Sequence, residues 1–139
     1  MATRQATAVW EGTLKEGNGS LQYGKYNQPF NFISRFEGSG ETNPEELLGA
    51  AHAGCFTMAL NSALFREGFT PGKVQTTATV HLTKGESGFS ISQIDLNCEA
   101  QVPGIDPAKF QEMAEATKDN CIVSRALSAV PMQLTAKLV

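Results

Sequence analysis

Three cysteines are the residues of this 139-residue chain that could most readily carry out chemistry. They are Cys55, Cys98 and Cys121, separated by 43 and 23 residues. These separations suit neither the disulfide framework of a small secreted protein nor the close cysteine pairs of a zinc site. In a reducing compartment, such cysteines are either inert core residues or redox-active thiols.

The surroundings of each cysteine in the sequence give different expectations. Cys55 lies in an apolar, small-residue segment, where packing is the simplest role because free cysteine is often buried. Cys121 stands between two predicted helical segments, where a helix N-terminus could lower a thiol pKa. Cys98 shares the apolar alternation of a strand with Leu96 and Ala100, so we expect it to be structural.

A nucleophilic cysteine at neutral pH needs a nearby cation. Lowering a thiol pKa from about 8.5 to about 6 requires about 3.4 kcal/mol of preferential stabilisation of the thiolate. A solvent-exposed ion pair contributes at most about 1 kcal/mol, so the cation has to be partly buried. Arg35 is the candidate, because its charge is permanent and its planar fork can hold a thiolate and a carboxylate together. A plain surface arginine is the alternative.

Glu45 or Glu46 could be the carboxylate partner of a buried Arg35. Both could instead only complement the dipole of the helix that they begin. Ten residues separate Glu45 from Cys55, which is about 15 Å along a straight helix. If both serve one site, the arginine has to bridge them, or the carboxylate comes from a second copy of the chain.

The two histidines are expected to have no part in the chemistry. His52 precedes Cys55 by one helical turn and could act as its base, but packing is favoured because no charged partner is evident. His81 lies on the polar side of an alternating segment and is expected to face solvent.

The elements that carry these residues predict an α+β domain. Asn43-Pro44 begins a helix that runs to about Glu67, and Asp106-Pro107 begins another that runs to about Asn120, with a shorter helix after Cys121. In the predicted strand at residues 30–36, the phenylalanines share one face, and the Arg35 side chain is expected to point to the opposite face. A β-bulge is expected near Gln93. Strands are predicted at residues 7–11, 30–36, 74–83, 89–100 and 132–138.

Composition excludes several classes of protein. The chain is 41% hydrophobic with a net charge of −3 and no like-charge run beyond two residues, which argues against a nucleic-acid partner. No segment resembles a signal peptide or reaches the roughly 20 apolar residues of a membrane span. We therefore expect a single domain over residues 1–139, cytoplasmic, with no nucleic-acid or membrane partner.

Four segments, spread in order over the chain, resemble signatures of the OsmC/Ohr family of organic hydroperoxide reductases, and the OsmC branch most closely. They are RFEG at 35–38, TNPEELLGAAHAGCF at 42–56, VPGID at 102–106 and CIVS at 121–124. A long Asn-Pro-Glu-Glu-Leu helix that contains Cys-Phe, with a second cysteine 66 residues after the first, is a specific pattern.

The resemblance implies a cysteine-based peroxidase of antioxidant and stress defence. Cys55 would be the peroxidatic cysteine and Cys121 the resolving one, while Arg35 and Glu45 would activate the thiolate and orient the peroxide. Oxidation would give a sulfenic acid and then a Cys55–Cys121 disulfide, which an external dithiol such as a lipoylated protein would reduce. The family has no metal or flavin cofactor.

The resemblance also implies an intertwined homodimer, in which long central helices pack against antiparallel β-sheets. An apolar pocket would favour an alkyl or lipid peroxide over hydrogen peroxide. Its candidate lining residues are Phe30, Phe32, Phe36, Leu48 and Phe56.

Two residues depart from the family pattern. Ile122 follows Cys121 where proline is common, which is expected to loosen the resolving loop or to alter the rate of disulfide formation. Gly54 stands where alanine is frequent and costs about 1 kcal/mol of helix propensity. Two other functions stay open: a protein that binds a hydrophobic small molecule, and a redox sensor or disulfide-exchange protein.

Overall fold

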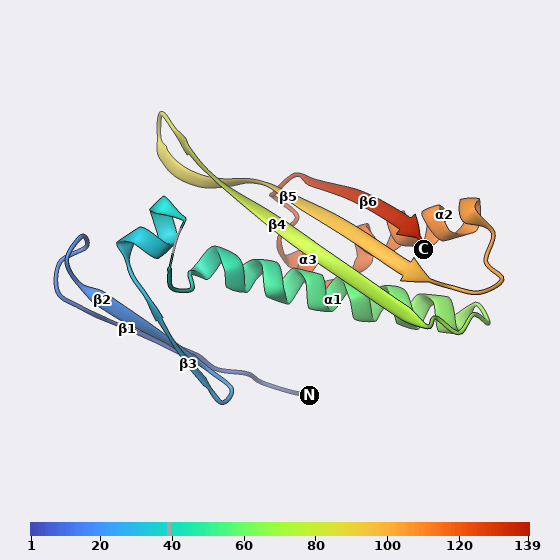
Figure 1. Cartoon of the computed structure of the whole chain (residues 1–139), viewed down its shortest axis with the longest axis horizontal. Helices are drawn as coiled ribbons and strands as arrows, with labels where there is room; N and C mark the ends of the chain where they lie inside the picture. Colours follow the sequence, from blue (N-terminus) through green and yellow to red (C-terminus); the bar gives the residue numbers. More distant parts are fainter. Residues whose placement is uncertain (39) are drawn as a thin grey trace. The chain divides into compact units, whose positions relative to one another are not determined.

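The computed structural model describes residues 1–38 and 40–139. The chain forms two compact units, Met1–Leu47 and Leu48–Val139, which are described separately below. Figure 1 labels the helices and strands of both units.

The N-terminal unit contains a three-stranded antiparallel sheet in the order β1 (Ala6–Glu11), β2 (Asn18–Tyr23) and β3 (Tyr26–Phe30). Gly19 in the central strand pairs with Trp10 on one side and with Phe30 on the other. A Cβ atom at Gly19 would come within 2.5 Å of the Phe30 ring. Glycine therefore lets the two rings approach to 5.3 Å across the central strand.

The strand predicted over residues 30–36 is wrong, because β3 ends at Phe30 and a π-helical turn follows at Ile33–Glu37. Two side chains explain the difference. The backbone N–H of Ser34 donates to Asn31 Oδ1 at 2.8 Å, and the backbone N–H of Asn31 donates to Ser34 Oγ at 3.0 Å. These local bonds offer the backbone an alternative to strand pairing.

The π-helical turn also changes the expected direction of Arg35. In a strand, Arg35 would face away from the phenylalanines, whereas here its guanidinium lies 5.3 Å from the Phe36 ring. The rings of Phe32 and Phe36 are 5.1 Å apart, as expected for residues four apart on a helical turn. The cation and the two rings thus belong to one cluster.

The C-terminal unit is built on a second three-stranded sheet, β4 (Lys73–Gly85), β5 (Gly88–Gln101) and β6 (Met132–Leu138). The β4–β5 pair is antiparallel, as predicted. β6 runs parallel to β5, because the helical segment between them provides the long crossover that a parallel pair needs. His81 pairs with Gln93 and Leu82 with Ile91, so the predicted bulge is confirmed at Ser92.

Three helices follow the predicted signals: α1 (Pro44–Arg66), α2 (Pro107–Asn120) and the short α3 (Ile122–Ala126). Asn43 Oδ1 accepts the backbone N–H of Glu46 at 2.8 Å, and Asp106 caps α2 in the same way. α1 has the length and apolar composition of a membrane-crossing helix, but core helices of soluble proteins often pass the same test.

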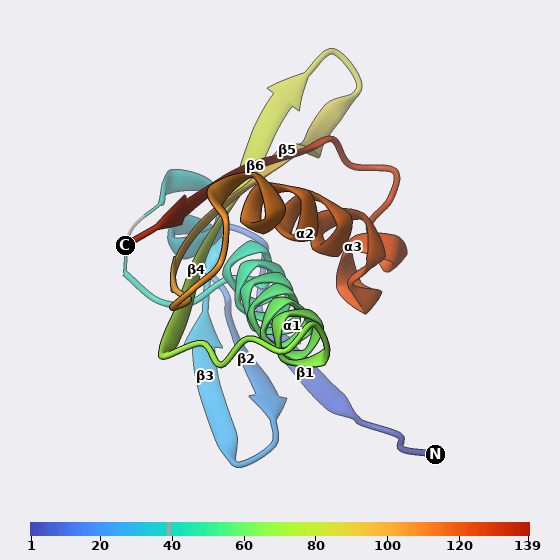
Figure 2. The ribbon, with the colours of Figure 1, turned by 90° about the vertical axis from the view of Figure 1, so that its right-hand side faces the viewer.

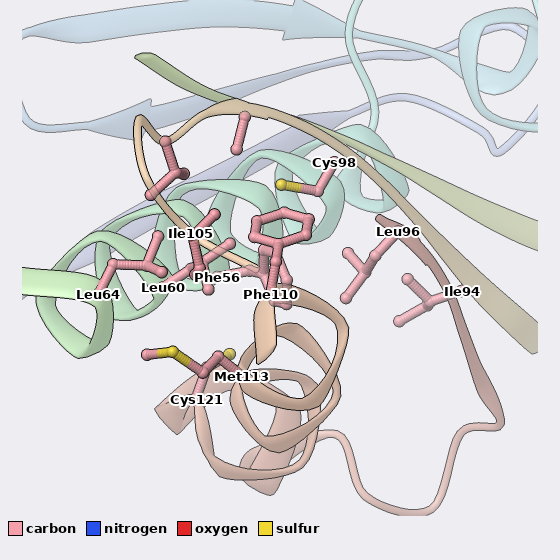
Figure 3. Packing of buried hydrophobic residues seen from close by; sticks show 12 residues of the cluster. Phe56, Leu60, Leu64, Ile94, Leu96, Cys98, Ile105, Phe110, Met113 and Cys121 are labelled. Carbon is pink, nitrogen blue, oxygen red and sulfur yellow. The ribbon is translucent and has the colours of Figure 1, made fainter. Parts of the chain in front are cut away.

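Figure 2 shows α1 and α2 beside the sheet of the C-terminal unit, and both helices supply side chains to one core on it (Figure 3). Gly49 allows α1 to approach β4, since a Cβ atom there would lie 3.3 Å from the carbonyl oxygen of Ala78. Cys98 is buried in this core, in agreement with its expected structural role. The innermost side chains of the core are Phe56, Leu60, Leu64, Ile94, Leu96 and Phe110.

The C-terminal unit covers only one face of α1. Met58 and Phe65 keep 78% and 69% of their surface exposed. Ala50, Ala51 and Gly54 are exposed as well. We call these five residues the open face of α1; it is apolar and made largely of small residues.

Candidate active site

The structure brings Cys55 and Cys121 together, although 66 residues separate them in the sequence. Cys55 lies in the middle of α1, and Cys121 is the residue between α2 and α3 that caps α3. The Cys121 thiol and the backbone amides of Ile122 and Val123 all act on the pKa of Cys55, so these groups lie near its sulfur. Within the described chain, all three cysteines are free thiols.

The C-terminal unit alone does not activate Cys55. Burial raises the pKa of the Cys55 thiol, and the adjacent Cys121 thiol raises it further. The backbone amides of Val123 and Ile122 act in the opposite direction without reversing the shift. A thiolate at this position therefore needs a positive charge from outside this set of groups.

Cys121 is held by the first turn of α3. Its side chain is 3% exposed, and its Sγ atom accepts the backbone N–H of Ser124 at 3.3 Å. The Ser124 hydroxyl also lies 3.1 Å from Sγ. The second cysteine is thus buried and fixed by one serine through two contacts.

His52 is fully buried, as packing predicts, but it also has a polar partner. Its Nε2 atom lies 2.7 Å from Ser124 Oγ. Burial lowers the pKa of His52, so the neutral ring is favoured. This contact joins α1 to α3 across 72 positions, and its only sequence signal was the presence of Ser124 in the CIVS segment.

Arg35 and Glu45 form an ion pair within the N-terminal unit. The Nη2 and Nε atoms of Arg35 lie 3.0 and 3.2 Å from Glu45 Oε1. The Oε2 atom of Glu45 is buried and has no hydrogen-bond partner among the described residues. Glu46 instead accepts a bond from Thr42 Oγ1 at 3.0 Å, so Glu45 is the carboxylate that holds the guanidinium.

A largely apolar pocket of about 440 Å³ lies beside this arginine in the N-terminal unit. Three of the five expected pocket residues line it together with Arg35, namely Phe30, Phe32 and Phe36. Leu48 belongs to the C-terminal unit and is partly buried. Phe56 is completely buried in the core of that unit.

The second histidine of the chain lies outside this group of residues. His81 lies on the exposed side of β4 and contacts Asp95 at 2.7 Å, which lowers the pKa of that carboxyl. Among residues 1–38 and 40–139, no group of three or more His, Cys, Asp or Glu side chains could hold a metal ion.

The family model described as OsmC-like protein matches residues 37–135. The chain belongs to this family. It is 48% identical over 129 residues to peroxiredoxin OsmC of Escherichia coli, covering 91% of this chain and 90% of that protein. From this identity over most of its length, we conclude that the chain is a peroxidase.

Two more distant OsmC-like relatives carry the name of an organic hydroperoxide resistance protein. The Xanthomonas axonopodis pv. citri protein is 30% identical over 90 residues, covering 64% of this chain and 61% of the relative. The crystal structure of OhrB from Bacillus subtilis has a TM-score of 0.70 at 25% identity, covering 97% of this chain and 98% of that one.

Proposed function

We propose that this peroxidase reduces organic hydroperoxides through Cys55 and Cys121. The Cys55 thiolate attacks the distal peroxide oxygen and expels an alcohol, becoming a sulfenic acid. Cys121 condenses with it to a disulfide and water, and an external dithiol restores both thiols by exchange. The observation that carries the proposal is the contact between these two free thiols.

We propose that Arg35 supplies the positive charge that Cys55 lacks in its own unit. Glu45 fixes one edge of the guanidinium and leaves the remaining N–H donors for a thiolate or a peroxide oxygen. The adjacent pocket with Phe30, Phe32 and Phe36 suits the alkyl group of an organic or lipid peroxide. Leu48 and Phe56 stay predictions for this pocket.

We propose a cytoplasmic homodimer built from a single domain. The open face of α1 is an apolar surface that a second copy of the chain can cover, and small residues permit close packing of two helices. A second copy also offers another source for Arg35 and Glu45. The free cysteines fit a reducing compartment, where a dithiol such as a lipoylated protein can recycle the enzyme.

Steady-state assays test the activity. With cumene hydroperoxide and a dihydrolipoyl reductant, the protein is expected to turn over many equivalents, and to use hydrogen peroxide less well. A redox sensor would react once and stop, and a binding protein would keep its thiols. Either result would contradict the proposed function.

Replacing Cys121 with serine is expected to limit the protein to a single reaction with hydroperoxide. The variant should consume about one equivalent of organic hydroperoxide and then stop, because Cys55 is oxidised without a resolving thiol. Stopped-flow peroxide consumption measures this. In the matched control Cys98→Ala, turnover should persist, since Cys98 is buried in β5. Continued turnover of Cys121→Ser with the dihydrolipoyl reductant would remove Cys121 from the cycle.

Replacing Met58 with glutamate is expected to weaken the dimer. A charge at this exposed apolar position would be buried without a partner if two α1 helices pack together. Sedimentation velocity should show a shift towards monomer at micromolar concentration. Ser87→Glu in the β4–β5 turn adds the same charge elsewhere and should leave the dimer intact. An unchanged sedimentation coefficient in Met58→Glu would argue against α1 as the interface.

A further inference from the structure

A buried chain of three polar side chains joins the second cysteine to a histidine. Cys121 Sγ lies 3.1 Å from Ser124 Oγ, and Ser124 Oγ lies 2.7 Å from His52 Nε2. Cys121, Ser124 and His52 are 3%, 4% and 0% exposed. The described C-terminal unit thus connects a reacting sulfur to an imidazole through one hydroxyl, away from solvent.

The chemistry of the three groups allows proton transfer along this chain. A serine hydroxyl can accept from a thiol and at the same time donate to an unprotonated imidazole nitrogen. The backbone N–H of Ser124 also donates to Cys121 Sγ at 3.3 Å, so the same residue holds the sulfur beside its hydroxyl. Packing alone would not require a sulfur, a hydroxyl and a ring nitrogen to lie in line.

We propose that His52, acting through Ser124, accepts the proton of Cys121 while the disulfide forms. The inference rests on the proposed function of Cys121 as the resolving cysteine. His52 and Ser124 thus take part in disulfide formation and not in the oxidation of Cys55. Ser124 contacts the reacting sulfur, and His52 acts through Ser124.

The atoms of this step balance without any added reactant. The Cys121 S–H proton moves to Ser124 Oγ while the Ser124 proton moves to His52 Nε2. The Cys121 thiolate attacks the Cys55 sulfenic acid, the new S–S bond forms and the S–O bond breaks. The departing oxygen takes the proton that His52 releases and leaves as water, so His52 returns to its neutral form.

The surroundings of His52 make its protonated form short-lived, because burial disfavours the charge and Nδ1 has no hydrogen-bond partner among the described residues. Burial is the only cause that lowers the pKa of His52, and no charged side chain in the described part of the chain contributes to the shift. Cys121 contacts the Ser124 hydroxyl directly, and the charged residues Lys118, Asp119 and Arg125 line the same pocket as Ser124. A ring with a lowered pKa returns its proton readily, and His52 lies one turn before Cys55 on the same helix.

Ser124→Ala and His52→Asn test the proposal in a single-turnover experiment. Reduced protein is mixed with one equivalent of cumene hydroperoxide, and the Cys55 sulfenic acid is trapped at intervals with dimedone. Oxidation of Cys55 is expected to keep its rate, while disulfide formation slows by about 100-fold, the size of a general-base contribution. Ser124→Ala keeps the test valid if His52→Asn fails to fold.

The pH dependence separates proton transfer from packing. Above the lowered pKa of His52, disulfide formation in the unaltered protein should be independent of pH from about 6.5 to 8, near and above the ordinary histidine pKa. In Ser124→Ala it should rise steadily with pH, because solvent hydroxide has to take the thiol proton. Ser124→Thr keeps the hydroxyl and should restore the rate. Thr117→Val is the control: it removes a buried hydroxyl that donates to the Met113 carbonyl in its own helix, and it should leave the rate of disulfide formation and its pH dependence unchanged.

Two results would overturn the relay. The first is a Ser124→Ala protein that forms the disulfide at the rate of the unaltered protein and with the same dependence on pH. The second is that Ser124→Ala and Ser124→Thr slow disulfide formation equally, and that the rate is independent of pH in both. In either case normal oxidation of Cys55 would leave the proposed function standing. Failure of Cys55 to react in the unaltered protein would instead contradict that function.

Discussion

Replacing Cys55 with serine is expected to reduce organic hydroperoxide turnover to the uncatalysed rate. Enzymes accelerate their reactions by about 10⁶-fold or more, so the loss should reach at least about 10⁴-fold. The physical reason is that a serine hydroxyl is not ionised at neutral pH and is a much weaker nucleophile than a thiolate. The sulfur–oxygen exchange is small in volume, and the residue is only partly buried, so the fold should persist.

The Cys55→Ser measurement needs both kinetics and a test of folding. Peroxide consumption at pH 7 with the dihydrolipoyl reductant gives the rate, and circular dichroism compares the fold with that of the unaltered protein. Cys98→Ala serves as the control for loss of one thiol from the same unit. A folded Cys55→Ser protein with ordinary turnover would disprove the proposed mechanism.

Replacing Arg35 with alanine is expected to slow the first step by about thirtyfold at pH 7. This is the change in thiolate fraction when a thiol pKa moves from about 6 back to about 8.5. The direction follows from the site, because burial and the Cys121 thiol already raise the pKa of Cys55 and the amides of Val123 and Ile122 do not reverse this. Without the guanidinium, the protonated thiol predominates.

The pH profile of Cys55 oxidation shows the sign of the Arg35 effect. In the unaltered protein the rate should level off near neutral pH and fall in acid, where the thiolate is protonated. In Arg35→Ala the rate should continue to rise through pH 8.5. Arg35→Lys keeps the charge but loses the fork that Glu45 Oε1 binds, so an intermediate profile is expected. Identical profiles in all three proteins would remove Arg35 from thiolate activation.

The helices and the second sheet were predictable because their signals are local. Asn43 and Asp106 accept the backbone N–H groups that their sequence positions predict, and both helices begin at the following proline. The phase change near Gln93 likewise located the bulge at Ser92. The parallel direction of β6 was not predictable, since it depends on how the whole α2–α3 segment crosses back to the sheet.

Two features of the candidate site were not predicted: the turn that carries Arg35, and the bond between His52 and Ser124. Alternating phenylalanines suggested a strand over residues 30–36, but the reciprocal bonds between Asn31 and Ser34 close a turn instead. The hydrogen bond between Ser124 and His52 joins distant segments, so no periodicity or spacing could indicate it. Side-chain bonds of this kind are set by tertiary packing and carry no local pattern.

The most direct test of the mechanism is peptide mapping after one equivalent of organic hydroperoxide has reacted with the reduced protein. The sample is alkylated, digested without reductant and analysed by mass spectrometry. The mechanism predicts a single cross-linked pair that joins the peptides of Cys55 and Cys121, with Cys98 recovered as an alkylated thiol. Recovery of Cys55 as an alkylated thiol, or a disulfide that includes Cys98, would contradict it.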